Sequence, residues 1–221
     1  MDHGKRDAHS GDRRLASLVT QIIEACNRAP ASRALLVGIS GIDASGKGFV
    51  SVKVADALRA ESLNVALISA DDWLNLPHVC VNPGNYAEHF YEHAIRFDEM
   101  FKSLILPLGK ERGLVLTADI ADAIATSYRK HTYEFADIDI VLLEGIFIFK
   151  PAYRKQFDLR VWIDCSFECA LERAITRGQE GLLPAETIEA FETIYFPAQR
   201  IHLARDKPRD AAHVSFTNDE L

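Results

Sequence analysis

The sequence predicts an α/β protein in which a mainly parallel β-sheet lies between two layers of helices. Short apolar runs alternate along the chain with segments of helical periodicity, which is the pattern of β-α-β units. A glycine-rich loop stands between the first apolar run, residues 34–39, and a predicted helix at residues 47–61. Strand-loop-helix units joined by right-handed crossovers build folds of three α/β/α layers. We therefore expect a fold of this class.

The composition is that of an ordinary globular protein with an acidic balance. The chain has 221 residues, of which 48% are hydrophobic and 26% are charged, and its net charge is −7. This length can bury one sizeable core. An acidic chain is a poor electrostatic match for nucleic acid or anionic membranes, and no apolar run approaches the length that spans a bilayer. We therefore expect no nucleic acid and no membrane as partners.

The cysteines and the first residues bear on location and domain organisation. Four cysteines occur without a CxxC pair, namely Cys26, Cys80, Cys165 and Cys169. This usage fits a reduced compartment better than a disulfide scaffold, so we expect a cytoplasmic protein. Residues 1–12 are polar and charged, without the apolar core of a secretory signal, and we expect them to be disordered. Residues 13–221 are then expected to form a single domain.

The remaining elements follow from periodicity and from residues that break it. Helical spacing predicts helices over residues 13–29, 87–107, 166–177 and 185–196. Apolar runs predict strands over residues 64–69, 114–116, 138–143, 159–163 and 214–216. Prolines and glycines predict a loop over 74–86, a break at 178–181 and an interruption at Pro197. We expect a helical lid around residues 178–200.

The strongest chemical signal is the loop between the first strand and the second helix. Gly41, four further residues, Gly46 and Lys47 fit the pattern G-x-x-x-x-G-K, which is typical of phosphate-binding P-loops. Glycines let the backbone approach a phosphate, and successive amides and the helix N-terminus point at the anion. Lys47 adds a charge that can follow a transferred phosphoryl group. We therefore expect ATP to contact Gly41, Asp43, Ala44, Ser45, Gly46, Lys47, Gly48 and Phe49.

The position after Lys47 departs from this pattern. A serine or threonine hydroxyl normally ligates Mg²⁺ there, whereas this chain has Gly48 followed by Phe49. Ser51 lies too far along the helix to be an obvious substitute. Losing a ligand to a charged centre costs about 1.5–3 kcal/mol, so we expect Mg²⁺ to be held weakly, or through water and carboxylates. Asp43 is expected to cap the loop through its own backbone.

Carboxylates follow two of the predicted strands. Asp71 and Asp72 come after residues 64–69, and Glu144 comes after residues 138–143. Ligands bind at the carboxyl ends of the strands in this architecture. One aspartate could accept the proton of an attacking hydroxyl, and Glu144 occupies the position at which P-loop enzymes hold their metal or its water. The alternatives are an N-capping pair on a surface turn and an ordinary strand-end glutamate.

Other polar pairs are weaker signals. Arg173 and Arg177 lie four residues apart on one face of a predicted helix, where they could clamp phosphates or simply face solvent. His89 and His93 have the spacing of a helical metal pair, but no third ligand stands out in the sequence. We therefore expect no metal at the two histidines.

Taken in order, these motifs resemble the uridine kinase and phosphoribulokinase group of P-loop kinases. The matching pieces run from about residue 33 to residue 217. They are the phosphate loop at 41–48, Ser-Ala-Asp-Asp-Trp at 69–73, Glu-Gly-Ile at 144–146, Phe-Asp-Leu at 157–159, the arginine-bearing helix at 166–177 and Ala-Ala-His-Val at 211–214. The resemblance implies a P-loop NTPase fold, and the ordered set is more specific than the loop alone.

The resemblance also implies roles for single residues. Asp71 falls where the group has its catalytic aspartate, and Arg173 and Arg177 match arginines of the lid. Tyr91, Glu92 and His93 resemble a Phe-Asp-His segment. This implies that Glu92 grips the ribose hydroxyls of a substrate with His93 beside it.

One segment departs from the group. Its Pro-x-Tyr-Asp pocket segment falls near residues 118–123, where this chain has Ala-Asp-Ile-Ala-Asp-Ala. The aromatic wall for a pyrimidine base is missing there. Asp119 or Asp122 could serve another acceptor, such as a different nucleoside, a sugar or a small alcohol.

We therefore expect an ATP:alcohol phosphotransferase, similar to uridine kinase, that acts on a nucleoside or another small molecule. ATP and Mg²⁺ are the expected cofactors, and a homo-oligomer is compatible with the sequence. The expected catalytic residues are Lys47, Asp71, Arg173 and Arg177, the metal ligands Asp71 and Glu144, and the acceptor-binding residues Asp72, Glu92, His93 and Asp122. Two alternatives stay open: a nucleotide-binding homologue that has lost catalysis, because of Gly48 and Phe49, and a nucleoside-monophosphate kinase, because of Gly-Lys-Gly.

Overall fold

The computed structural model describes residues 3–80, 84–122, 124–178 and 182–218, and it confirms the predicted α/β class. At its centre is a five-stranded sheet in the order β2-β5-β1-β6-β7, in which all pairings are parallel. The carboxyl ends of these strands therefore lie at one edge of the sheet. The strands are β1 (Leu35–Gly41), β2 (Val65–Ser69), β5 (Ile140–Glu144), β6 (Leu159–Asp164) and β7 (Val214–Thr217).

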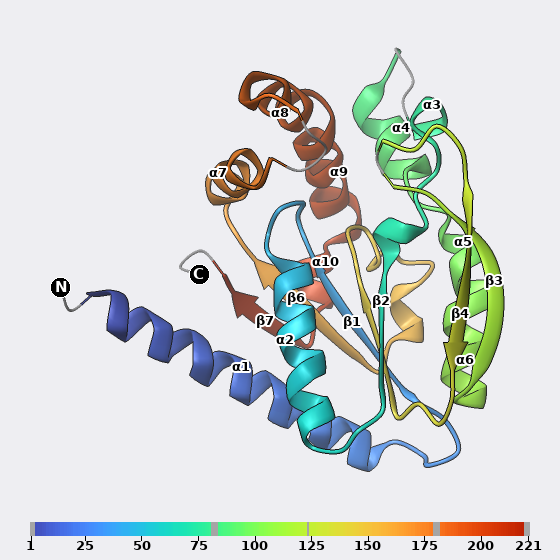
Figure 1. Cartoon of the computed structure of the whole chain (residues 1–221). Coiled ribbons are helices and arrows are strands. Elements are labelled where there is room, and N and C mark those ends of the chain that lie inside the picture. The colour runs from blue at the N-terminus through green and yellow to red at the C-terminus, as the bar shows by residue number, and fades with distance from the viewer. Residues whose placement is uncertain (1–2, 81–83, 123, 179–181, 219–221) are drawn as a thin grey trace.

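Helices cover both faces of this sheet, which makes three layers (Figure 1). Helices α1 (His3–Arg28) and α2 (Lys47–Ala60) share one hydrophobic core with Val37 of β1, whereas α9 (Phe196–Asp206) shares the opposite core with Leu36. Successive residues of a strand point to opposite faces, so neighbours in β1 enter different cores. Burial on both faces explains the continuous apolar runs of these strands.

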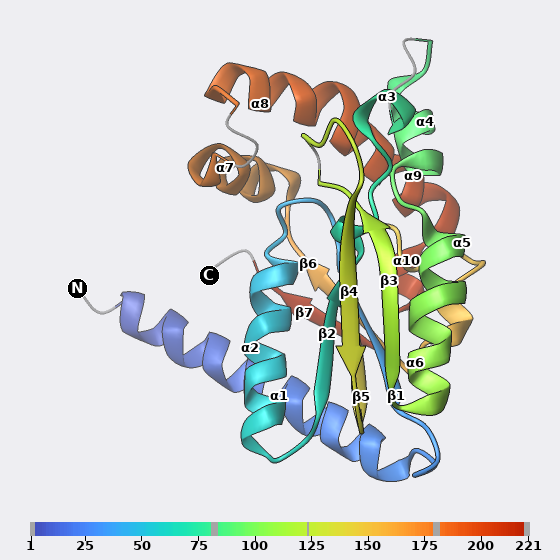
Figure 2. The ribbon, with the colours of Figure 1, turned by 45° about the vertical axis from the view of Figure 1, so that its right-hand side comes forward.

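The helices expected to form a lid follow β6. Helix α7 (Phe167–Arg177) is followed by α8 (Pro184–Ala190), a π-helical turn η5 (Phe191–Tyr195) and α9. Figures 1 and 2 show α7 and α8 beyond the carboxyl edge of the sheet. The short helix α10 (Pro208–Ala211) then leads to β7. Part of the predicted glycine break, residues 179–181, lies outside the described residues, and a movable lid stays a prediction.

Pro197 does not interrupt its helix, and this expectation was wrong. Pro197 occupies the first turn of α9, directly after η5, where the Phe196 amide donates to the Phe191 carbonyl five residues back. A proline is tolerated in a first turn because its missing amide is not needed there. The Thr193 hydroxyl donates to the Glu189 carbonyl over 2.6 Å within the same turn. The π-type turn thus lets one helical path continue through the proline.

The single helix predicted over residues 87–107 was also wrong. Helix α4 (Tyr86–His93) ends before a short break, and a second helical path runs through α5 (Phe97–Met100), the π-helical turn η2 (Phe101–Ile105) and α6 (Leu106–Glu111). Asn75 explains the break. Its amide donates to the Ala94 carbonyl over 2.8 Å, and its side chain donates to the His93 carbonyl over 2.7 Å. These carbonyls would otherwise have bonded within the helix.

A β-hairpin packs beside these helices. Strands β3 (Leu114–Ile120) and β4 (Arg129–Phe135) pair antiparallel, with Leu114 opposite Phe135. The sequence predicted only residues 114–116, because most side chains of β4 are exposed and leave little apolar alternation to detect. A further short helix, α3 (Pro77–Cys80), lies within the loop predicted over 74–86.

The N-terminal helix begins earlier than the sequence predicted. Of residues 1–12, which were expected to be disordered, residues 1–2 lie outside the described part of the chain, and α1 begins at His3. The start of the domain stays a prediction. None of the helices in the described ranges is long and apolar enough to cross a membrane.

Candidate active site

The phosphate loop lies at the carboxyl end of β1, the central strand, and α2 begins at Lys47. Gly46 has a φ angle of +83°, which favours glycine, and a side chain there would collide with the Asn218 amide. A Cβ atom on Gly41 would lie 2.6 Å from Ser45 Oγ. The shape of the loop therefore requires both glycines of the motif.

Groups distant in sequence hold the loop in this shape. The Ser45 carbonyl accepts hydrogen bonds from Asn218 Nδ2 over 2.7 Å and from Arg173 Nη1 over 3.3 Å. Arg173 Nη2 also donates to the Asn218 carbonyl over 2.5 Å. Within the loop, the Ala44 amide donates to Asp43 Oδ1 over 2.9 Å, which confirms the predicted capping role of Asp43. Contacts from Asn218 and Arg173, together with the Asp43 cap, therefore hold the loop in this shape.

Lys47 lies among carboxylates at the start of α2. Its side chain is almost buried, with 7% exposed. Burial disfavours the ammonium, but Asp71, Glu144 and Asp43 together outweigh burial and raise the pKa of Lys47, against a smaller opposing effect of Arg177. Lys47 is therefore charged at neutral pH and faces the place where these carboxylates converge.

Glu144 is held beside Lys47 by the register of the sheet. Glu144 pairs with Ser69 across β5 and β2, and Ser69 Oγ donates to Glu144 Oε1 over 2.5 Å. Glu144 Oε2 is buried and has no hydrogen-bond partner among the described residues. Burial raises the pKa of Glu144, and Lys47 opposes this effect. A buried polar oxygen without a partner is costly, so Oε2 is suited to receive an external group.

Asp71 and Asp72 lie in a short 3₁₀ turn, η1 (Ala70–Asp72), directly after β2. Ser69 Oγ caps this turn by accepting from the Asp71 amide over 3.3 Å. Solvent reaches the Asp71 side chain from the cleft, but protein surrounds its other sides. This withdrawal from water raises the pKa of Asp71, and Lys47 opposes it. Burial also raises the pKa of Asp72.

The oxygen atoms around Lys47 fit a hard divalent cation. Mg²⁺ prefers oxygen ligands and usually takes one or two carboxylates together with waters and substrate phosphates. The unpartnered Glu144 Oε2 and the Asp71 carboxylate are donors of this kind. No group of three or more metal-binding side chains forms a closed site within the described ranges. The chain therefore offers a partial site of the sort that phosphates complete.

Gly48 has no side chain at the position where P-loops usually carry a serine or threonine hydroxyl. A Cβ atom on Gly48 would meet no atom within 4 Å. The neighbouring Phe49 is 57% exposed, and Lys53 Nζ lies 4.5 Å from the centroid of its ring. The chain thus lacks the usual hydroxyl at a position where nothing in the fold excludes one.

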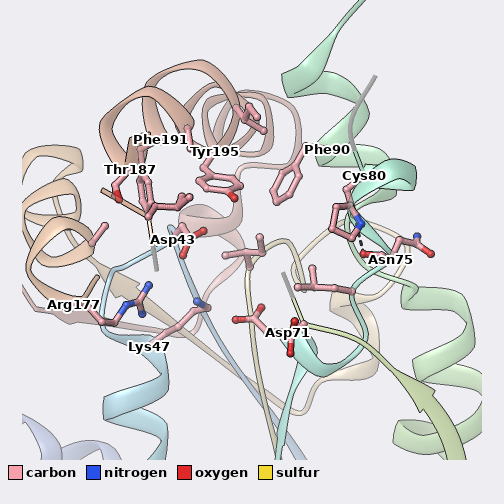
Figure 3. Close-up of a pocket in the computed structure, with 18 of the residues that line it drawn as sticks. Asp43, Lys47, Asp71, Asn75, Cys80, Phe90, Arg177, Thr187, Phe191 and Tyr195 are labelled. Carbon is pink, nitrogen blue, oxygen red and sulfur yellow. Dashed lines mark hydrogen bonds between the residues drawn. The ribbon is translucent and has the colours of Figure 1, made fainter. Parts of the chain in front are cut away.

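Two cavities meet at Lys47 and Arg177. The first, of about 250 Å³, lies between the phosphate loop, η1, α4 and the α8–η5 segment (Figure 3). The second, of about 600 Å³, lies between the start of α2 and α7, and Gly48, Phe49 and Glu172 are among its walls. Lys47 and Arg177 line both cavities. A ligand in either cavity would therefore reach the same pair of cations.

Aromatic residues that the sequence analysis did not single out line the first cavity. Phe90 comes from α4, and Phe191 and Tyr195 come from η5 (Figure 3). The ring centroids of Phe90 and Tyr195 lie 5.1 Å apart, and those of Phe191 and Tyr195 lie 5.2 Å apart. Their spacing in the sequence is that of ordinary helical core residues, so only the fold reveals their place. Asn218, which fastens the loop, gave no signal either.

The predicted site residues fall into distinct places. The first cavity is lined by Lys47, Arg177 and the four carboxylates Asp43, Asp71, Asp72 and Asp122, whereas Arg173 lines the second cavity and binds the loop. The structure does not bring the predicted acceptor-binding residues Glu92 and His93 to the first cavity. Glu92 and His93 are exposed and absent from its walls, and Glu92 Oε1 lies 4.0 Å from Arg205 Nη1. Their binding of an acceptor stays a prediction.

Comparisons with curated proteins place this site in context. No family model matches the chain. The chain is 26% identical to the uridine kinase of Alkaliphilus metalliredigens over 171 residues, which cover 76% of this chain and 80% of that protein. It is 27% identical to the uridine kinase of Macrococcus caseolyticus over 171 residues, with 75% and 80% covered. The predicted resemblance to uridine kinases is therefore confirmed.

Solved structures agree on the fold. A possible uridine kinase from Bacillus stearothermophilus superposes with a TM-score of 0.74 at 22% identity, covering 93% of this chain and 98% of that chain. A D-glycerate 3-kinase from Cryptococcus neoformans superposes with a TM-score of 0.63 at 13% identity, covering 84% and 87%. At these identities the likeness concerns the fold, which confirms the predicted three-layer architecture shared with P-loop kinases.

Proposed function

We propose that the protein transfers the terminal phosphoryl group of ATP to a hydroxyl of a small molecule. The main observation behind this proposal is that Lys47 and Arg177 line both cavities. ATP lies with its phosphates on the 41–48 loop and its nucleoside in the second cavity, beside Phe49. The acceptor lies in the first cavity, with its hydroxyl at Asp71. The similarity to uridine kinases supports this reaction class.

Asp71 acts as the general base in this proposal. The acceptor oxygen bonds to the terminal phosphorus while the bond from that phosphorus to the bridging oxygen breaks, which releases ADP. The hydroxyl proton passes to Asp71, whose raised pKa suits it to accept a proton near neutral pH better than an ordinary aspartate would. Lys47 stabilises the charge on the transferring group, and Arg177 does so from the side of α7.

Glu144 and Asp71 would hold Mg²⁺ in this arrangement, with Ser69 orienting Glu144 through its hydrogen bond. Bound Mg²⁺ would neutralise part of the negative charge of the phosphates. Phosphoryl transfer needs little covalent chemistry from the protein, so most of the rate enhancement comes from positioning and electrostatics. The fastened loop and the nearly buried lysine provide both.

Measurement of ADP release from Mg-ATP tests the proposal against nucleosides, nucleotides, sugars and simple alcohols. Acceptor-dependent ADP formation is expected, and Lys47→Ala should lower it by at least about 10²-fold to 10³-fold while the circular dichroism spectrum stays the same. Unchanged activity of Lys47→Ala would overturn the assignment of the site.

Gly48 favours a second candidate, a nucleotide-binding homologue without kinase activity. It predicts ATP binding with no ADP release for any acceptor, so the same screen separates it from the first candidate. The nucleoside-monophosphate kinase is less well supported. The described residues of the first cavity provide no cation besides Lys47 and Arg177 for the phosphate of such an acceptor. Comparison of UMP and CMP with uridine tests this alternative.

A further inference from the structure

The acceptor side of the first cavity is largely apolar. Its apolar walls come from the segment after η1, helix α4, the residue after Gly145, helix α7, Leu182 and the α8–η5 segment. Figure 3 shows Phe90, Tyr195 and Phe191 on the side of the cavity opposite the Lys47 ammonium. The apolar walls are Leu74, Pro77, Cys80, Phe90, Ile146, Ala174, Leu182, Ala190, Phe191, Ile194 and Tyr195.

Apart from the carboxylates, the polar groups in these walls are the Asn75 amide and the Thr187 and Tyr195 hydroxyls. Asn75 donates to the His93 carbonyl through Nδ2, and its Oδ1 accepts from the Tyr128 hydroxyl over 3.1 Å. Asp122 Oδ1 accepts from the Ile124 amide over 3.1 Å. A sugar or nucleoside brings several hydroxyls, and each one that is buried without a partner is costly. The apolar walls therefore match an acceptor with an apolar body better than they match a polyol.

The charges of the cavity disfavour an anionic acceptor. Among the described lining residues the cations are Lys47 and Arg177, which belong to the phosphate end. The carboxylates are Asp43, Asp71, Asp72 and Asp122. A carboxylate or phosphate on the acceptor would meet like charges and an apolar wall, and both raise the free energy of the bound state.

A buried clasp fixes the aromatic part of the wall. It consists of Tyr91, His202 and Asp206: the Tyr91 hydroxyl donates to Asp206 Oδ2 over 2.7 Å, and His202 Nδ1 lies 2.6 Å from the same oxygen. Tyr91 follows Phe90 on α4, and Asp206 ends the helical path that carries Tyr195. The clasp thus joins the helices that bear the two rings, which makes the wall a preformed surface.

On the proposed function, we infer that the acceptor is an uncharged alcohol with an apolar or aromatic body and few other polar groups, and that Phe90 and Tyr195 are specificity-determining residues that contact this body. The hydroxyl of the acceptor reaches Asp71, and its body lies against the two rings. The volume of about 250 Å³ suits a small molecule of this kind. The reaction is the transfer described above, with ADP as the second product.

A matched set of acceptors tests the inference. Benzyl alcohol, 2-phenylethanol and cyclohexylmethanol are compared with 4-(hydroxymethyl)benzoate as the anionic match, and with uridine, fructose and glycerol as polyols. ADP release gives kcat/KM, and calorimetry with a non-hydrolysable ATP analogue gives acceptor binding without turnover. The uncharged aryl alcohols should exceed the benzoate by at least about tenfold in binding or kcat/KM.

Variants of the wall supply the second readout. Phe90→Leu and Tyr195→Leu should each raise the KM or Kd for the aryl alcohols about threefold to tenfold and leave the KM for ATP unchanged. Phe167→Leu is the matched control, because Phe167 packs on Phe196 with ring centroids 4.6 Å apart and belongs to neither cavity. It should leave both constants unchanged.

The outcomes separate this inference from the proposed function. Turnover with uridine, fructose or the benzoate but not with the aryl alcohols overturns the inference and leaves the kinase assignment standing. ATP binding without any turnover overturns the proposed function, and the calorimetric preference then decides the inference alone. Equal binding of the uncharged and anionic alcohols, or wall variants that behave as Phe167→Leu does, also overturns it.

Discussion

The two ends of the first cavity are built in different ways. The phosphate end comes from one continuous segment, residues 41–48, and its shape depends on backbone dihedrals at glycines. The acceptor end comes from side chains on several separate parts of the chain, and its shape depends on how helices pack. A backbone-built site tolerates few substitutions, whereas a side-chain-built site can change its ligand by single substitutions. The phosphate end therefore indicates the reaction class, and the acceptor end indicates the substrate.

Both ends are fastened from a distance, but by different means. Asn218 and Arg173 hold the Ser45 carbonyl of the phosphate loop, whereas the acceptor wall depends on the clasp of Tyr91, His202 and Asp206. The first fastening acts on a main-chain carbonyl through an amide and a guanidinium group. The second buries a carboxylate beside a histidine, so the acceptor end should respond to pH through this contact.

The largest effect is expected at Asp71, where the two ends meet. Asp71→Asn should lower kcat by about 10²-fold to 10⁴-fold, because an amide cannot accept the proton of the acceptor hydroxyl. Burial raises the pKa of Asp71 above its ordinary value of 3.8, and the base works only when deprotonated. In the wild type kcat/KM should therefore fall on the acid side.

The control for Asp71 is Asp122→Asn in the same cavity. Asp122 is exposed and its Oδ1 accepts an amide of its own loop, so this variant should change kcat by less than about tenfold. Equilibrium binding of ATP without Mg²⁺ should be similar in both variants. An Asp71→Asn enzyme that retains wild-type kcat would remove Asp71 from the mechanism.

The next effect is expected in the clasp. Tyr91→Phe removes a donor from the buried Asp206 carboxylate, which should lower the free energy of unfolding by about 1–3 kcal/mol. Tyr153→Phe is the matched control, since the Tyr153 hydroxyl donates over 2.6 Å to the exposed Asp98 and water can replace it. Urea unfolding measures both variants. Equal losses in the two would show that the buried position of the clasp has no special importance.

The clasp should also make stability depend on pH. Burial lowers the pKa of His202 below 6.5, despite the opposing effect of Asp206. The unfolded chain therefore binds a proton at His202 more readily than the folded chain does, so stability rises with pH. The contribution is complete above about pH 6.5 and falls below it, with a slope of at most about 1.4 kcal/mol per pH unit. His202→Asn should reduce this slope between about pH 7 and pH 5.

A second titratable group near His202, the Lys150 ammonium, also bears on how stability depends on pH. Lys150 lies above the Tyr91 ring, with its Nζ 4.0 Å from the centroid, and burial lowers the pKa of Lys150 to about 8. Its titration falls on the alkaline side and does not overlap the window of His202. An unaltered slope in the His202→Asn variant would assign the acid sensitivity to other groups.

The smallest effect is expected at Gly48, in the phosphate loop. Gly48→Ser places a hydroxyl where a Cβ atom meets nothing within 4 Å, so the fold should accept it. It should lower the Mg²⁺ concentration for half-maximal activity or ATP binding by about threefold to tenfold. Gly48→Ala adds the same Cβ without the hydroxyl and should leave the Mg²⁺ dependence unchanged. The same shift in both variants would exclude ligation by the new hydroxyl.

Most of the sheet and the phosphate end could be predicted from the sequence because their signals are local. Apolar runs of strand length predicted β1, β2 and β5, and the spacing of Gly41, Gly46 and Lys47 predicted the loop. The position of Glu144 beside Asp71 followed from the parallel sheet, since strand ends meet at one edge. In each case the residues that make the feature are neighbours in sequence or are equivalent positions of neighbouring strands.

The acceptor end could not be predicted, because its determinants lie between elements. Asn75 ends α4 by bonding to the Ala94 and His93 carbonyls, a contact that periodicity does not contain. Phe90 and Tyr195 look like core residues, and they become a wall only because α4 packs against α9. Residues 118–123 lack the aromatic wall that the uridine kinase group has at this position. In the fold, aromatic side chains of other elements line the cavity.

The π-type turn η5 determines which side chains of its segment face the cavity. A π turn holds about one residue more than an α turn, and one residue rotates the helix by about 100°. The side chains that η5 presents to the cavity therefore depend on helical phase as well as on residue identity. Removing a single residue between Phe191 and Tyr195 would restore an unbroken α-helix and turn a different face inward. Specificity could thus change by an insertion or deletion while the aromatic residues of the segment are retained.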